Sequence, residues 1–199
     1  MLNTSLNFPT LIYLNGPSTS GKTTLADKLI SLDEKSILQY HFATPLWTVC
    51  DTLLEHRLSI NTGADAPLDF NSQEVKESRP FASALKTWRE ILIDLGNVTR
   101  NAFGSDYFSH AAAIATETML LNGIETIIFP TTRTLDDLSE LVKLVPKRNQ
   151  LLIRIERDGT SFENDIGNYL YPEIPSITME NNGTLDEFYT SVISYLTGE

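Results

Sequence analysis

One stretch near the start of the sequence constrains the fold more than any other. Residues 13–25 read YLNGPSTSGKTTL, in which two glycines five positions apart are followed by a lysine and two threonines. A β-rich apolar run, Thr10–Leu14, precedes the glycines, and a run with leucines at helical spacing, Lys22–Leu32, follows them. The sequence therefore predicts a buried strand that leads through a flexible loop directly into an amphipathic helix.

The loop matches the pattern G-x-x-x-x-G-K-[ST]. Gly16 and Gly21 allow backbone turns closed to residues with a Cβ atom, so successive N–H groups can converge on one point, where the new helix adds its dipole. We predict a nucleoside triphosphate site in which Lys22 reaches the β- and γ-phosphates and the Thr23 hydroxyl holds Mg²⁺. The candidate ATP-binding residues of the loop are Gly16, Pro17, Ser18, Thr19, Ser20, Gly21, Lys22, Thr23 and Thr24.

The rest of the chain alternates between strand and helix patterns, and several helices carry recognisable caps, such as the Thr184–Glu187 capping box. This alternation predicts an α/β fold of three layers, a parallel sheet flanked by helices on both faces. The predicted strands after the first are 36–42, 124–129, 150–156 and 176–180. The predicted helices after the first are 45–58, 81–103 with a break near Gly96, 105–123, 134–145 and 184–196.

Composition bounds the organisation of the chain. Its 199 residues, 41% of them hydrophobic, predict a single domain over residues 1–199 with an ample core. Between residues 59 and 80 the periodic pattern gives way to a polar stretch with Gly63, Pro67 and Pro80, which we interpret as a surface or lid-like insertion.

The charge and the cysteine content limit the classes of binding partner and the cellular compartment that the sequence fits. The net charge of −11 argues against a nucleic-acid or membrane binder, so phosphates must be bound locally. The sequence shows neither a targeting pattern nor an apolar run of membrane-spanning length. The single cysteine, Cys50, cannot form an internal disulfide, and we expect a cytoplasmic protein. The oligomeric state is left open, with a homodimer as one alternative.

From about Phe42 onward, four stretches resemble the phage-type deoxynucleoside monophosphate kinase family in order and spacing. The resemblance covers about three quarters of the chain and implies a nucleoside monophosphate kinase-like P-loop fold with helical NMP-binding and lid insertions. It also implies transfer of the γ-phosphate of ATP to a deoxynucleoside or nucleoside 5′-monophosphate in the host cytoplasm of a phage. The four stretches are FATPLWTVCDTLL, WREILIDLGNVTRNAFGSDYF, TIIFPTTRTLDDLSEL, and LLIRIERDG with MENNGTLDEFYTSV.

The same resemblance implies roles for individual residues. Arg89 and Arg100 would grip the phosphate of the acceptor, because the guanidinium fork suits a phosphate bidentately. Arg133 would lie near the phosphate loop if the strand before it neighbours the first strand. The candidate catalytic residues are thus Lys22, Arg133 and Arg89. Further candidates are Arg157 as a lid charge (with Arg154), Asn182 and Gly183 at the adenine, and Asp106, Tyr107 and Phe42 at the acceptor.

Two positions depart from the family pattern. Thr44 stands where the family has an aspartate, and Pro130 and Thr131 stand where an aspartate follows the long strand. These acids would hold the acceptor or the water shell of Mg²⁺, so their replacement indicates a shifted substrate, a different acid such as Asp51 or Asp106, or a weak enzyme.

Two alternatives to the monophosphate kinase remain open. The stretch IYLNGPSTSGKTTLADKL also resembles the opening of chloramphenicol-phosphotransferase-like kinases, which phosphorylate a small-molecule hydroxyl. The second alternative is a catalytically degenerate nucleotide-binding module.

The histidines (His41, His56 and His110) lack ligand spacing, so no metal site is predicted among them. Cys50, Trp47 and Trp88 are read as packing residues.

Overall fold

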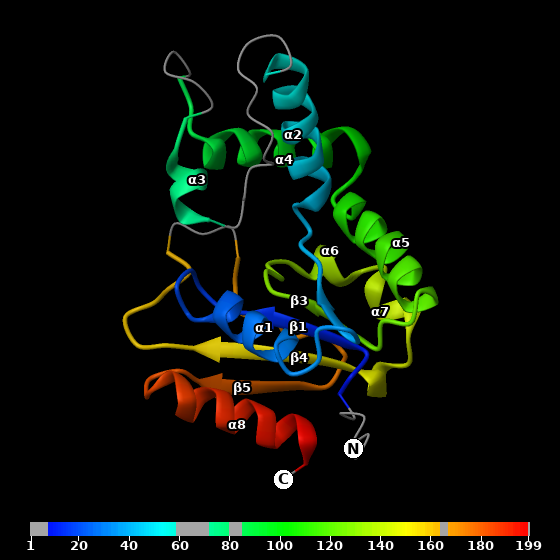
Figure 1. The fold of residues 1–199 in the computed structure, drawn as a ribbon, viewed down its shortest axis with the longest axis vertical. Coiled ribbons are helices and arrows are strands. Elements are labelled where there is room, and N and C mark those ends of the chain that lie inside the picture. The colour runs from blue at the N-terminus through cyan, green and yellow to red at the C-terminus, as the bar shows by residue number, and fades with distance from the viewer. Residues whose placement is uncertain (1–7, 59–71, 80–84, 164–166, 199) are drawn as a thin grey trace. The chain divides into compact units, whose positions relative to one another are not determined.

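The structure, a computed structural model, describes residues 8–58, 72–79, 85–163 and 167–198. The chain divides into two compact units (Figure 1). Unit 1 comprises Met1–Phe42 and Ser109–Glu199, and unit 2 comprises Ala43–Phe108. The single P-loop domain predicted for residues 1–199 stays a prediction.

Unit 1 is built on a five-stranded sheet in which every neighbouring pair of strands is parallel. Its order is β2-β3-β1-β4-β5, so the first strand lies at the centre, between β3 and β4. Every residue of β1 is buried, as expected for a strand covered on both faces. The strands are β1 (Leu11–Asn15), β2 (Ile37–Gln39), β3 (Thr126–Phe129), β4 (Gln150–Glu156) and β5 (Ser176–Glu180).

Helices cover the sheet of unit 1 on both faces (Figure 1). On one face, α1 (Lys22–Ile30) and α8 (Leu185–Thr197) pack their buried apolar side chains against alternate residues of the strands. On the other face lies α7 (Leu141–Leu144), where the buried Gln150 amide donates to the carbonyl of Val142. The remaining helices of unit 1 are α5 (Tyr107–Leu121), which begins in unit 2, α6 (Leu135–Leu138) and the short 3-10 helix η1 (Lys147–Asn149). The predicted α/β fold with a parallel sheet between helices is confirmed.

The helix predicted over residues 134–145 is divided in two, and that prediction was wrong in its continuity. Its start is confirmed, because Thr134 and Asp137 form a reciprocal capping box at α6. The break has a tertiary cause: the N–H of Glu140 donates to the buried Ser109 hydroxyl at 2.9 Å. This hydrogen bond links positions far apart in the sequence, so no local pattern announces it.

Unit 2 is helical in its described residues, with α2 (Thr44–Leu58), α3 (Gln73–Glu77) and α4 (Trp88–Phe103). Cys50 and Trp88 are buried together, and Trp47 packs against them, which confirms the packing reading of these residues. Burial and the neighbouring Asp51 raise the pKa of the Cys50 thiol to about 11, so it stays protonated at neutral pH.

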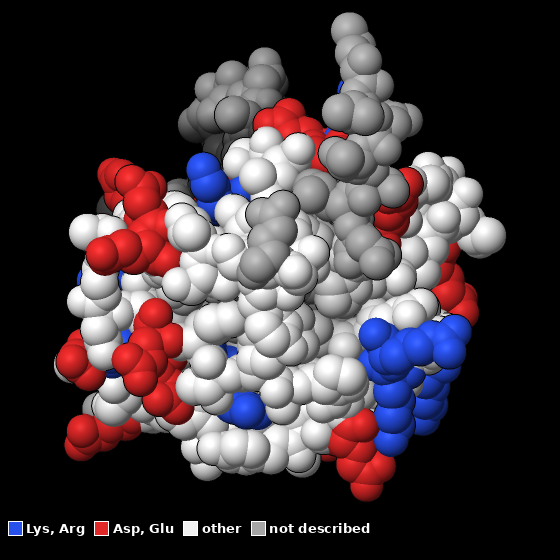
Figure 2. Space-filling view, turned by 90° about the horizontal axis from the view of Figure 1, so that it is seen from below, with Lys and Arg blue, Asp and Glu red and all other residues white. Residues whose placement is uncertain are grey.

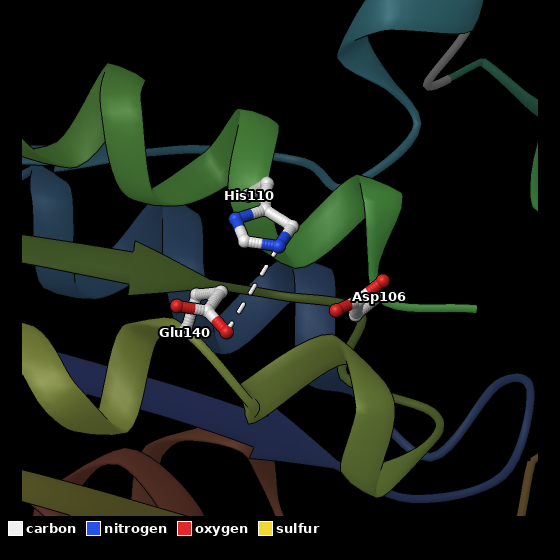
Figure 3. A group of neighbouring side chains, drawn as sticks. All are labelled: Asp106, His110 and Glu140. Atoms are coloured by element: carbon white, nitrogen blue, oxygen red, sulfur yellow. Dashed lines mark ion pairs between the residues drawn. The ribbon is translucent and has the colours of Figure 1, made fainter. Parts of the chain in front are cut away.

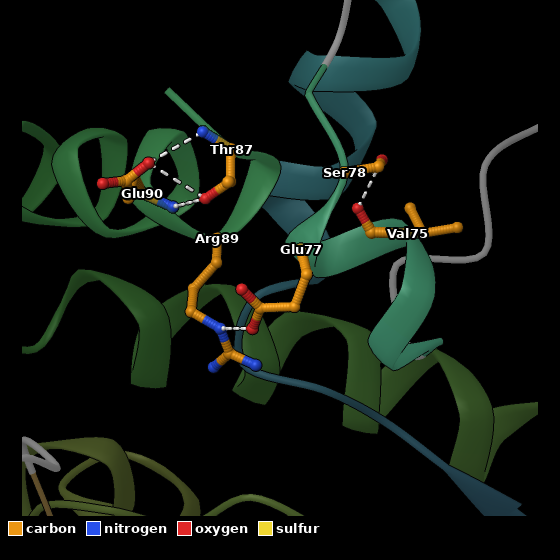
Figure 4. Close-up of polar contacts among 6 residues, drawn as sticks. All are labelled: Val75, Glu77, Ser78, Thr87, Arg89 and Glu90. Carbon is orange, nitrogen blue, oxygen red and sulfur yellow. Dashed lines mark hydrogen bonds and ion pairs between the residues drawn. The ribbon is translucent and has the colours of Figure 1, made fainter. Parts of the chain in front are cut away.

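The polar stretch at 59–80 lies partly outside the described residues, namely at 59–71 and 80. In the described part of this stretch, the prediction of irregular structure was wrong, because residues 73–77 form α3. The side chain of its N-cap, Ser72, accepts a hydrogen bond from the N–H of Val75. Close-up contacts in Figure 4 show how α3 and α4 are fixed: Thr87 and Glu90 form a capping box, and Arg89 pairs with Glu77.

The break predicted near Gly96 is also wrong, because α4 runs through this residue without interruption. Gly96 is buried, and a Cβ atom built there would lie 3.6 Å from Leu46 Cδ1 and 3.5 Å from Arg100 Nη1. Both distances are ordinary van der Waals contacts. The glycine is thus required neither by its backbone angles nor by lack of space.

Replacing Gly96 with alanine is therefore expected to stabilise the protein. Alanine removes the conformational freedom that glycine has in the unfolded chain, a gain of about 0.5–1 kcal/mol in a helix. Urea denaturation followed by circular dichroism would measure the free energy of unfolding. A decrease in that free energy would show that the contact with Leu46 is tighter than its geometry indicates.

The surface fits the acidic composition. Among the described residues in the view of Figure 2, acidic side chains are spread widely, whereas Lys and Arg form one compact group at an edge and a few isolated positions. This face thus offers no extended basic surface of the kind that follows a nucleic-acid backbone. No helix within the described ranges has both the length and the apolar character needed to cross a bilayer.

Candidate phosphate-binding site

The glycine-rich loop leaves the carboxyl end of β1 and enters α1 through two left-handed residues. Thr19 has a φ of 62° and Gly21 a φ of 104°. At Gly16, a Cβ atom would lie 2.6 Å from the carbonyl oxygen of Ile155 in the adjacent strand β4. Gly21 is therefore needed for its backbone conformation and Gly16 for the close approach of two backbones.

The beginning of α1 differs from the beginnings of four helices that a side chain caps. No side chain caps α1, and its first turn carries no acidic residue. By contrast, side chains cap α3, α4, α6 and α8, namely Ser72, Thr87, Thr134 and Thr184. The first N–H groups of α1 are therefore available to donate hydrogen bonds to an anion. The positive end of the helix dipole would attract the same anion, as at other helix starts that follow a glycine-rich turn.

The lysine of the motif lies over the loop itself. Lys22 Nζ donates to the carbonyl of Gly16 at 2.7 Å and to the carbonyl of Pro17. Its distance to the Ser20 hydroxyl is 3.5 Å. Thr23 and Thr24 follow in the first turn of α1, and both are exposed. The ammonium and the hydroxyl of the motif are thus placed on the same short segment.

The loop that carries Arg133 is attached to the end of β1. β3 is the direct neighbour of β1, which is the condition for Arg133 to lie near the phosphate loop. The N–H of Thr132 donates to the carbonyl of Leu14 at 3.1 Å, and the side-chain amide of Asn15 donates to the carbonyl of Thr132 at 2.9 Å. Arg133 itself is exposed, and its backbone N–H donates to Asp137.

Residues after β4 and β5 contact the loop from its other side. Arg157 Nη1 donates to the carbonyl of Thr19 at 3.2 Å. The side-chain oxygen of Asn182 accepts a hydrogen bond from the N–H of Asp158 at 2.8 Å, which joins the turns that follow the two strands. Gly183 lies between Asn182 and the cap of α8.

Arg154 has a different environment from Arg157. Its guanidinium lies 4.8 Å from the ring centroid of Tyr171 and donates to the carbonyl of Leu170 and to the hydroxyls of Thr178 and Ser176. These contacts hold the segment before β5 against the sheet. We therefore assign Arg154 to the architecture of unit 1.

The arginines proposed for the acceptor lie in unit 2. Arg89, early in α4, forms an ion pair with Glu77 at 2.6 Å (Figure 4). Arg100, in the last turn of α4, lies 4.7 Å from the ring centroid of the buried Phe108. Asp106 and Tyr107 stand at the beginning of α5, where the Tyr107 ring packs edge-on against Phe108. Their roles at an acceptor stay predictions.

The chain segments after β2 and β3 carry no carboxylate. Tyr40, His41 and Phe42 follow β2, and Pro130, Thr131 and Thr132 follow β3. His41 Nδ1 lies 3.3 Å from the Thr131 hydroxyl. Phe42 is buried and stacks on Phe129, so its ring belongs to the packing of unit 1.

Two buried asparagines at strand ends are absent from the sequence-based candidates. Asn15, at the end of β1, is fully buried; it donates to the carbonyls of Thr132 and Asn168 and accepts from the N–H of Leu170. Asn181, after β5, is 3% exposed and donates to the carbonyl of Ser20 at 2.8 Å. Asn15 precedes Gly16, and Asn181 stands two residues before Gly183. Asparagines near a glycine are also typical of turns, so the sequence offers no signal for these long-range partners.

His110 belongs to a surface ion pair. Its Nε2 atom lies 4.0 Å from Glu140 Oε1 (Figure 3), and Lys143 contacts the same carboxylate at 2.6 Å. The His110 side chain is more than half exposed, so the pair contributes little to stability.

Comparison with known proteins supports the fold. No protein-family model matches the sequence, and no curated protein matches it. A sugar kinase from Janibacter sp. is similar in structure, with a TM-score of 0.50 and 13% identity over 94% of this chain and 93% of that one. The APS kinase of Mycobacterium tuberculosis matches with a TM-score of 0.44 and 15% identity, over 95% of this chain and 97% of that one.

The likeness to the sugar kinase concerns the fold alone. Together with the strand–loop–helix geometry at Gly16–Thr23, it places the chain among proteins with a P-loop kinase-like fold.

Proposed function

We propose that this protein is a P-loop phosphotransferase that moves the γ-phosphoryl group of ATP to a (deoxy)nucleoside 5′-monophosphate. The observation that carries the proposal is the phosphate loop: two required glycines, a helix start without a side-chain cap, and a lysine on the first helical turn. These features supply convergent N–H groups and positive charge for a polyphosphate, in a chain whose net charge is −11.

The residues of unit 1 fit ATP with Mg²⁺. Lys22 would exchange its bonds to loop carbonyls for the β- and γ-phosphates, and Arg157 would add charge from the adjacent turn. Arg133 would stabilise the transferring group. The Thr23 hydroxyl would hold Mg²⁺, which neutralises phosphate charge when bound. Asn182 and Gly183 would line the adenine.

The choice of acceptor depends on the resemblance to the deoxynucleoside monophosphate kinases. In this proposal Arg89 and Arg100 bind the acceptor's phosphate, because phosphate oxygens match the planar guanidinium fork. Asp106 and Tyr107 would contact the rest of the acceptor. Phe42, proposed for the same role, is buried against Phe129, so a direct contact with the acceptor would require its ring to become exposed.

A nucleotide-binding module without turnover is the second candidate. The observation in its favour is the chain after β2 and β3, where Tyr40–Phe42 and Pro130–Thr132 provide no carboxylate. Metal ions that bridge phosphates are commonly held by a carboxylate at such strand ends, so its replacement here would reduce turnover without preventing ATP binding.

An ADP-release assay separates the candidates. Purified protein with Mg²⁺–ATP would be given each nucleoside and deoxynucleoside monophosphate, with chloramphenicol-like alcohols in the same panel. Turnover with one or a few monophosphates is the expected result. Turnover with an alcohol alone would show that the acceptor is a small-molecule hydroxyl compound and not a nucleoside monophosphate. ATP binding in calorimetry without any turnover would favour the binding module, and absence of ATP binding would refute the proposed site.

A further inference from the structure

We propose that Asn181 is a positioning residue for the phosphate loop, a role that rests on the proposed function. It lies directly after β5, and its backbone N–H donates to the carbonyl of Glu156 at 2.8 Å, so its main chain is fixed to β4. From this position its side-chain amide donates to the carbonyl of Ser20, one residue before the left-handed Gly21.

The hydrogen bond to Ser20 determines the direction of a whole peptide group. In a planar trans peptide, the carbonyl and the following N–H point in opposite directions. Because the Ser20 carbonyl faces the Asn181 amide, the N–H of Gly21 faces away from that amide. That N–H stands at the start of α1, where convergent N–H groups would receive a phosphate oxygen.

The space around Gly21 supports the same pairing. A Cβ atom on Gly21 would lie 2.5 Å from Asn181 Nδ2, so with any other residue at position 21 the loop or the amide would have to move. Asn181 is 3% exposed, and a buried amide that donates to a buried carbonyl is not readily replaced by water. The buried Asn181 amide thus holds the Ser20–Gly21 peptide in one orientation.

Other bonds tie the same side of the loop to the turns after β4 and β5. Arg157 donates to the Thr19 carbonyl, and Asn182 accepts from Asp158 between the two turns. Asn181 differs from these exposed residues because it is buried. We infer that it organises the loop for phosphate rather than contacting the nucleotide itself.

The test compares two truncations of Asn181, Asn181→Ala and Asn181→Ser, because neither side chain reaches the Ser20 carbonyl. Calorimetry would measure the affinity of the full chain for tripolyphosphate and for ATP, and urea denaturation the free energy of unfolding. We expect both affinities to fall by about tenfold or more, in equal proportion, as for the loss of one hydrogen bond to a charged ligand.

A matched control is Gln150→Ala at the opposite, amino end of the sheet. Gln150 is a buried amide that donates to the carbonyls of Val142 and Val145, so its loss costs stability without reaching the phosphate loop. We expect its tripolyphosphate affinity to stay within about twofold of the native value, well short of the tenfold change that one lost hydrogen bond to charge would cause.

The outcomes distinguish the inference from the function on which it rests. Unchanged tripolyphosphate affinity in a folded Asn181 variant would overturn the inference, whether or not ATP affinity fell, since a loss confined to ATP indicates a role at the base. A Gln150→Ala variant that lost as much affinity would overturn it too, by showing a general effect of instability. Native protein that binds neither tripolyphosphate nor ATP would refute the proposed function itself.

Discussion

Replacing Lys22 with alanine is expected to lower the rate of phosphoryl transfer by roughly 10²–10³-fold, the usual cost of removing one preorganised charge at a transition state. The fold is expected to survive. In the structure, Lys22 Nζ donates to the carbonyls of Gly16 and Pro17 in its own loop, and the side chain is only partly buried and lies outside the apolar core of unit 1. Initial rates of ADP release and the free energy of unfolding in urea would measure the two effects separately.

The control for this variant is Lys28→Ala on the same helix. Lys28 is exposed near the other end of α1, where its Nζ lies 5.7 Å from the ring centroid of Tyr189. Its removal changes the net charge by the same amount but leaves the phosphate loop untouched, so the transfer rate should be unchanged. Equal losses in both variants would mean that overall charge, rather than a placed ammonium, governs the reaction.

The parts of the fold that the sequence predicts best are those in which several local signals coincide. β4 and β5 have the predicted bounds, 150–156 and 176–180. α8 begins after Thr184, whose capping box with Glu187 was predicted from spacing alone. The phosphate loop belongs to the same class, because its glycines, its lysine and the flanking strand and helix all lie within about two dozen residues.

What the sequence does not predict depends on partners that are distant along the chain. Gly96 resembles a helix break by propensity, yet the helix continues through it and packs beside Leu46. The amide of Glu140 donates to Ser109 and ends a helical run that is locally continuous. Asn181 contacts Ser20 at a separation of 161 residues, and Asn15 joins three segments in the same manner. Single-sequence patterns carry no record of such contacts.

Replacing Gly21 with alanine is expected to damage both stability and ATP binding. The φ of 104° places position 21 in the left-handed region, where a residue with a Cβ atom costs about 1–3 kcal/mol. The added Cβ would also lie 2.5 Å from Asn181 Nδ2, so the loop or the amide must move. We expect the free energy of unfolding to fall by about that amount, and ATP affinity by about tenfold or more.

Gly96→Ala provides the comparison that isolates the cause, because it makes the same chemical change at a helical position with ordinary space around it. If glycine matters only through the entropy of the unfolded chain, both alanine variants should gain stability. If the left-handed turn and the contact with Asn181 determine the effect at position 21, Gly21→Ala loses stability while Gly96→Ala gains it. A Gly21→Ala protein with native stability and native ATP affinity would therefore contradict both the strained turn and the fixed Ser20–Gly21 peptide.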